Sequence, residues 1–75
     1  MPEISRFLGI VIAMYYNEHN PPHFHARYGQ FLAGKLPPKA LGLVMEWATL
    51  HQDDLMADWV LARDNAELKP IGPLE

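Results

Sequence analysis

Proline constrains the fold of this chain more than any other residue, because its ring fixes φ and removes a backbone hydrogen-bond donor. Six of the seven prolines stand at three places: positions 21–22, positions 37–38, and positions 70 and 73. Helix interiors and central strands do not accept such residues. Regular structure must therefore begin or end near each place, which predicts a turn at the first pair, the start of a helix at the second, and a non-helical tail around the last two prolines.

The residues before the second proline pair predict strands. Ile4–Tyr16 is rich in β-branched and aromatic residues, which favours a strand over a helix, and Gly9 within it indicates a bulge or a close backbone approach. Asn-Glu-His-Asn-Pro-Pro then supplies turn chemistry. Residues 23–29, His-Phe-His-Ala-Arg-Tyr-Gly, read as a second strand. We expect an antiparallel β-hairpin of two or three strands, the third at residues 30–36.

The residues after the second proline pair predict helices. Pro38 suits a first helical turn, and an apolar stripe shared with His51 and Asp58 follows helical spacing: Leu41, Val44, Ala48, Leu55 and Ala62. His-Gln-Asp-Asp at 51–54 breaks the pattern into helices at 38–51 and 53–64, with Asp53 as the cap of the second. One long kinked helix is the alternative.

The tail predicts an extended segment laid along the body, because three apolar residues recur at every third position: Leu68, Ile71 and Leu74. The fold class is therefore α+β, with an N-terminal hairpin packed against two C-terminal helices and an extended tail. Residues 1–75 form one small domain.

Length and composition limit how such a domain is stabilised. A chain of 75 residues buries a small core and commonly gains support from disulfides, metals or a partner. It has no cysteine, so disulfides and thiolate zinc sites are excluded and a cytoplasmic location is expected. The formal charge of −3 argues mildly against nucleic-acid binding. We expect neither a signal peptide nor a membrane span, because the N-terminal apolar run is short and has an acid near its start.

Three of the four histidines lie close together in the turn and the second strand. His19, His23 and His25 predict a divalent metal site of the zinc type, to which Glu18 or Asn17 can add an oxygen ligand. The alternative is that the two prolines only fix the turn and the histidines are exposed polar residues on a half-solvated strand.

The same histidines also suit acid–base chemistry without a metal. His23 and His25 are candidate catalytic residues for cleaving a phosphodiester, with Arg27 or Lys35 steadying the anionic transition state. His51 is expected to be a packed helical residue that joins the cluster only if its helix covers the hairpin turn.

The tryptophans and methionines of the helices have two interpretations. Trp47 and Trp59 are expected in the core, but together with Met45 and Met56 they also resemble a partner-binding face. A dimer or a contact with another protein is therefore expected. Three acids are expected to be solvated: Glu46, Asp58 and Glu67.

Several stretches resemble a known family: MPEISRF-GI at the start, HNPPHFHA, LPPKAL, and LHQDDLMADW in the helices. On these the chain is similar to the bacterial domain-of-unknown-function family 4160. The family's hallmark falls on His19, Pro21, Pro22, His23, Phe24 and His25, with His51, Leu55 and Trp59 as its helical signature. Relatives usually have a longer segment where this chain has only the residues between Gly29 and Leu36, which suggests a lost strand or an omitted loop.

The resemblance implies a protein of unsettled activity. Genes of the family often lie beside a second small domain of unknown function, in a pairing that resembles a toxin–antitoxin module. The first expectation is a protein-interaction component of such a module, bound to the small protein encoded next to it, to a second copy, or to both. The alternatives are a histidine-based phosphodiesterase or ribonuclease, metal-dependent or acid–base, and a DNA-binding transcriptional regulator.

Overall fold

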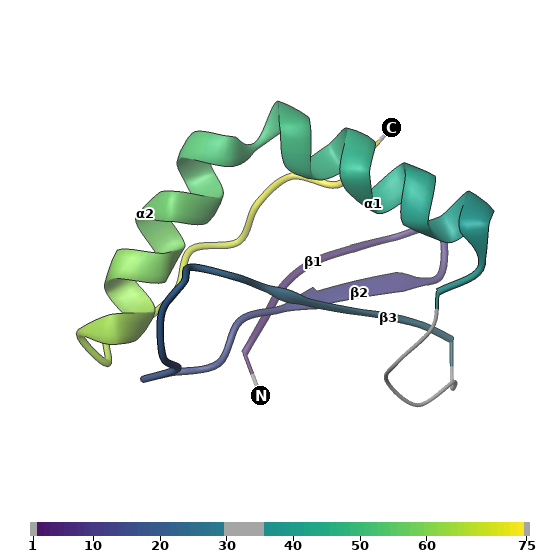
Figure 1. Ribbon diagram of the computed structural model, residues 1–75. Coiled ribbons are helices and arrows are strands. Elements are labelled where there is room, and N and C mark those ends of the chain that lie inside the picture. The colour runs from purple at the N-terminus through teal and green to yellow at the C-terminus, as the bar shows by residue number, and fades with distance from the viewer. Residues whose placement is uncertain (1, 30–35, 75) are drawn as a thin grey trace.

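The computed structural model describes residues 2–29 and 36–74 and shows a three-stranded sheet covered by two helices (Figure 1). The strands are β1 (Glu3–Phe7), β2 (Ile10–Ala13) and β3 (His25–Tyr28). They pair antiparallel in the order β1-β2-β3. The helices are α1 (Pro38–Leu50) and α2 (Gln52–Arg63), which confirms the α+β fold with its N-terminal strands and two C-terminal helices.

The prediction of one strand over Ile4–Tyr16 is wrong, because the chain reverses at Leu8 and Gly9 to make β1 and β2. Both residues have a positive φ, 52° and 81°, as a tight hairpin turn matched to strand twist requires. The close approach predicted at Gly9 is confirmed, since a Cβ there would lie 3.3 Å from Cε1 of Tyr28. This reversal divides the predicted strand into two, and so the sheet has three strands in all. The strand predicted at residues 30–36 falls mainly on 30–35, outside the described residues.

The break between the helices falls within the predicted run 51–54, at His51, one residue before the gap between the predicted helices. Its backbone, with φ −122° and ψ 29°, leaves the helical region, and α2 resumes at the next residue. The cap prediction is wrong: His51 occupies the N-cap position, and Asp53 lies inside the first turn of α2 with Asp54. Carboxylates in a first turn interact favourably with the positive end of the helix dipole.

The core lies between the sheet and the helices. Ile10, Ile12 and Trp47 are completely buried, and Trp59 is 5% exposed, so the core placement of both tryptophans is confirmed. Trp47 packs against Phe7 and Phe24, with ring centroids 5.5 and 6.0 Å away. The aromatic ring thus joins the first helix to β1 and to the residue that precedes β3.

The tail runs back along the helices as an extended segment, as predicted (Figure 1). The Ile71 amide donates to the Ile4 carbonyl at 2.8 Å, and the Trp47 indole N–H donates to the Gly72 carbonyl at 2.7 Å. Ile71 is buried and belongs to the core. The tail therefore closes the structure between β1 and α1.

Asp58 is buried, at 1% exposure, so its predicted solvation is wrong. Its Oδ1 accepts the Lys69 amide at 3.0 Å, while Oδ2 has no hydrogen-bond partner among the described residues. Burial raises the pKa of this carboxyl above its ordinary value, and the nearby Asp54 charge adds to the effect. Asp58 does lie on the predicted apolar stripe of the helix, and the tail covers its side chain.

No helix within residues 2–29 and 36–74 has the length and apolar character needed to cross a membrane.

Candidate functional site

The loop between β2 and β3 is held against the end of α2. The Asn17 amide donates to the Ala62 carbonyl at 3.3 Å, and the Asn17 side chain donates to Oδ1 of Asn65 at 2.9 Å. Asn17 has φ 57°, a left-handed conformation that asparagine accepts more readily than most residues. These contacts fix the point from which the next residue, Glu18, extends.

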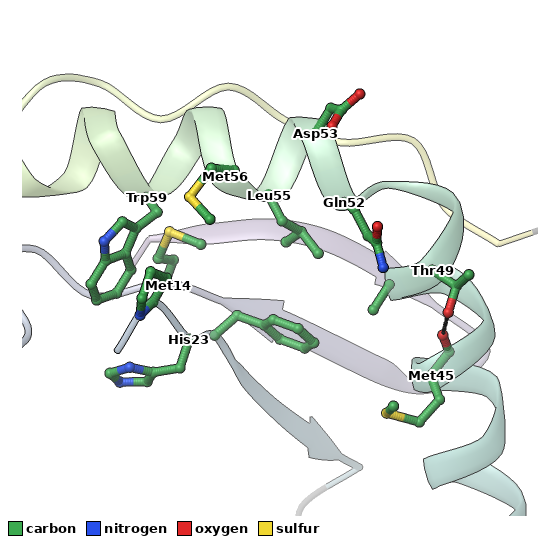
Figure 2. A pocket seen from close by; sticks show the side chains of 12 residues that line it. Met14, His23, Met45, Thr49, Gln52, Asp53, Leu55, Met56 and Trp59 are labelled. Atoms are coloured by element: carbon green, nitrogen blue, oxygen red, sulfur yellow. Dashed lines mark hydrogen bonds between the residues drawn. The ribbon is translucent and has the colours of Figure 1, made fainter. Parts of the chain in front are cut away.

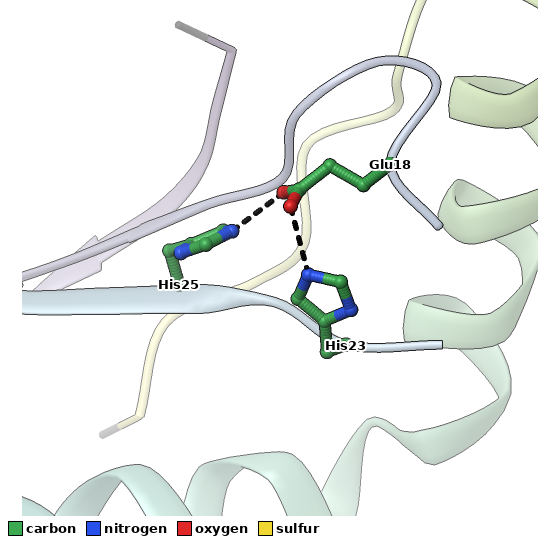
Figure 3. Close-up of side chains that lie close together, drawn as sticks. All are labelled: Glu18, His23 and His25. Atoms are coloured by element: carbon green, nitrogen blue, oxygen red, sulfur yellow. Dashed lines mark hydrogen bonds and ion pairs between the residues drawn. The ribbon is translucent and has the colours of Figure 1, made fainter. Parts of the chain in front are cut away.

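Glu18 reaches two histidines on the opposite arm of the loop (Figure 3). Its Oε1 lies 2.6 Å from Nε2 of His25, and its Oε2 lies 3.0 Å from Nε2 of His23. The rings of the two histidines stand edge to face with centroids 5.3 Å apart. One carboxylate thus bridges two imidazoles, and the three side chains are 23%, 43% and 32% exposed for Glu18, His25 and His23. The cluster is open to solvent.

A second hydrogen bond determines the protonation of His23. Its Nδ1 lies 2.8 Å from the Pro21 carbonyl oxygen, which can only accept, so Nδ1 must carry the hydrogen. The Nε2 that faces Glu18 then has a lone pair unless a proton or a cation stands between the two groups. The Pro21 carbonyl and, after it, Glu18 raise the pKa of His23. The bonds from His25 and then His23 lower the pKa of Glu18.

His23 also forms one end of an apolar groove between the loop and the helices (Figure 2). Its ring centroid lies 5.3 Å from that of Trp59. The groove has a volume of about 520 Å³, and its apolar walls come from Met14, Phe24, Met45, Leu55, Met56 and Trp59. Two of these side chains are largely exposed, Met45 at 58% and Met56 at 51%. A polar cluster and an apolar surface therefore share one residue.

The structure brings together two of the three histidines predicted to bind a metal. His23 and His25 join Glu18, and we call these three residues the trio. One ligand atom from each lies within 4.8 Å of the others. His19 is exposed and lies outside this trio, with its ring centroid 6.1 Å from that of His23. Glu18, expected only as an additional ligand, is the central residue.

Arg27 and His51 lie apart from the trio, and Lys35, predicted as the alternative to Arg27, falls outside the described residues. Arg27 is exposed on β3, opposite Val11, and its charge contributes to lowering the pKa of Glu3 after the larger effect of Arg6. His51 packs at the helix break, with its ring 5.4 Å from that of Trp47, and is not a member of the trio.

The groove was not predicted as a feature, although three of its residues, Met45, Met56 and Trp59, were noted together with Trp47 as a partner-binding face. The model of one family, described as Domain of unknown function (DUF4160), matches residues 9–60. This match spans β2, β3, α1 and most of α2, and so includes the trio and the groove. Neither the curated proteins nor the solved structures contain a match to the chain.

Proposed function

This chain belongs to the family described as Domain of unknown function (DUF4160), and we propose that it works as the protein-interaction component of a toxin–antitoxin-like two-gene module. The observation that carries the proposal is the apolar groove with exposed Met45 and Met56 in its walls. Methionine side chains are flexible and polarisable, and they suit surfaces that bind apolar segments of other proteins.

The amount of exposed apolar surface supports the same proposal. Beyond the two methionines, the helices expose Leu41 by 48% and Val60 by 40%. Large apolar side chains gathered on one small protein are typical of interaction surfaces rather than of free surface. We propose that the partner is the small protein encoded beside this one and that it inserts an apolar segment into the groove.

Co-expression with the adjacent gene product tests this proposal. We expect the two proteins to elute together at micromolar concentration, and Met45→Glu to separate them because it places a charge in the groove. Leu50→Glu is the matched control: it lies on the same helix, makes the same change in charge, and is exposed outside the groove walls. Separate elution of the wild-type proteins, or equal losses in both variants, contradicts the proposal.

A second candidate function is a histidine-based phosphodiesterase or ribonuclease, and the bridged pair of His23 and His25 favours it. Nε2 of His23 carries a proton towards Glu18 in the imidazolium form, as a general acid requires, and a second imidazole stands beside it. We expect RNA cleavage by the purified protein and its loss in the double variant His23→Ala, His25→Ala. His51→Ala is the control, and cleavage that survives the double variant rules out this candidate.

No feature of the described helices supports the third expected function, a DNA-binding regulator. The only basic residues of α1 and α2 are Lys39 and Arg63, which lie near opposite ends of the pair. A recognition helix needs more cationic side chains to engage phosphates.

A further inference from the structure

We propose that Glu18, His23 and His25 form a binding site for a divalent transition ion of the zinc class, in which Glu18 replaces His19 as the third ligand. The proposal goes beyond partner binding and assigns a ligand to the trio. It rests on the geometry of three side chains and one backbone carbonyl.

The ring nitrogens of His23 and His25 both face the Glu18 carboxylate (Figure 3), and one ligand atom from each of the three residues lies within 4.8 Å of the others. The Glu18 carboxylate lies 2.6 Å from Nε2 of His25 and 3.0 Å from Nε2 of His23. Ligands at about 2.0–2.2 Å from a tetrahedral zinc ion are separated by roughly 3.3 Å. Each of the two oxygen–nitrogen separations needs to widen by less than about 1 Å to reach this value. The partial exposure of the three side chains leaves them free to move apart.

The Pro21 carbonyl prepares His23 as a ligand. By accepting the hydrogen from Nδ1 it leaves the Nε2 lone pair facing Glu18. Histidines that bind metals nearly always donate their other ring hydrogen to a carbonyl or carboxylate, which fixes the tautomer and the ring orientation. The trio therefore has an outer hydrogen bond of the kind that metal sites use.

The set of donors selects the kind of ion. Two imidazole nitrogens and one carboxylate oxygen match zinc sites that keep a fourth position for water or substrate. Calcium and magnesium prefer oxygen ligands throughout, so they are poor candidates for a site with two imidazoles. Because the trio is partly exposed, solvent can supply the fourth ligand.

His19 provides an internal test of this ligand set. Its ring lies near that of His23, with centroids 6.1 Å apart, but it takes no part in the convergence of ligand atoms. A site built from three histidines needs His19, whereas the site proposed here needs Glu18. Zinc binding should therefore be lost in Glu18→Gln and kept in His19→Ala if the proposed site is correct, and the reverse should hold for a site of three histidines.

The experiment is a calorimetric titration of the purified chain with zinc chloride at neutral pH, repeated with cobalt chloride to record the visible spectrum of the bound ion. We expect one ion per chain and a cobalt spectrum of low coordination number. Glu18→Gln and His25→Ala should each weaken zinc binding by at least about tenfold. His19→Ala and His51→Ala should change it by less than about threefold.

Far-ultraviolet circular dichroism of each variant separates loss of ligand from loss of fold, and His25→Gln replaces His25→Ala if the latter unfolds. Absence of saturable zinc binding by the wild-type chain overturns the proposal. So does a loss of binding in His19→Ala that Glu18→Gln does not share. The titration uses the chain alone, so failure here is distinct from failure of the co-elution or RNA-cleavage experiments.

Discussion

Replacing Asp58 by asparagine should make the protein more stable as the pH rises, relative to the wild type. The Asp58 carboxyl is 1% exposed, and only one of its oxygens has a hydrogen-bond partner among the described residues. Burial raises its pKa above the ordinary value of 3.8, so the folded state holds the proton more tightly than the unfolded state. Asparagine has nearly the same shape, keeps the oxygen that accepts the Lys69 amide, and carries no charge to bury.

The sign and the size of the effect follow from proton linkage. A carboxyl with a raised pKa contributes its full stability below the unfolded pKa and loses it as the pH rises to the folded pKa. Over that interval the free energy of unfolding of the wild type falls by up to about 1.4 kcal/mol per pH unit relative to Asp58→Asn. Above the folded pKa the difference between the two proteins should be constant.

The assay is urea unfolding of both proteins at a series of pH values from about 4 to neutrality. Trp47 and Trp59 are buried, so their fluorescence reports unfolding directly. Asp53→Asn is the control: this acid is exposed in the same helix, and its removal should change stability by at most about 0.5 kcal/mol. A difference between wild type and Asp58→Asn that is independent of pH, or that falls with pH, refutes the reasoning.

Three further predictions concern the site, the core and the first turn. Glu18→Gln should lower the pKa of His23 towards 6.5, because it removes a carboxylate that raises this pKa; a nuclear magnetic resonance titration of the ring measures it, and an unchanged pKa contradicts the described pairing. Trp47→Phe should destabilise the protein by about 2 kcal/mol in urea unfolding, since it removes the donor to the Gly72 carbonyl and part of a fully buried ring; an effect below about 0.5 kcal/mol means the tail is not anchored there. Gly9→Ala should lower the free energy of unfolding by about 1 kcal/mol or more, because φ is +81° at this residue. Thermal unfolding measures the change, and an unchanged stability means that the turn adopts another conformation.

Local chemistry explains why much of the fold could be predicted from the sequence. Prolines at 37–38 place the start of α1 correctly, and the polar run at 51–54 places the break between the helices within one residue. The tail repeat of Leu68, Ile71 and Leu74 correctly predicts an extended segment against the core. Each of these signals depends only on a residue and its near neighbours.

The missed features depend on contacts between distant segments. The reversal at Leu8 was not predicted because leucine has no preference for a positive φ; Leu8 itself is exposed, and the pairing of β1 with β2 on either side of it accompanies the φ of 52°. Asp58 was expected in solvent because helical periodicity does not show that the tail, eleven residues later, supplies an amide to its side chain.

The candidate site shows the same limit. The short spacing of His23 and His25 correctly predicts that these two lie together, although β3 begins at His25 and His23 stands just before it rather than on the same strand. Whether His19 or Glu18 completes the cluster depends on the loop that Asn17 ties to the end of α2. No local pattern contains that information.

The position of His23 in both the polar trio and the groove wall has a thermodynamic consequence. Its Nε2 faces the Glu18 carboxylate, and its ring lies 5.3 Å from that of Trp59, so its orientation enters the free energy of both surfaces. If an ion at the trio makes a segment in the groove bind more tightly by some factor, that segment must make the ion bind more tightly by the same factor. A tenfold effect corresponds to a coupling free energy of about 1.4 kcal/mol. If such coupling exists, the His23 ring is the contact that the two surfaces share.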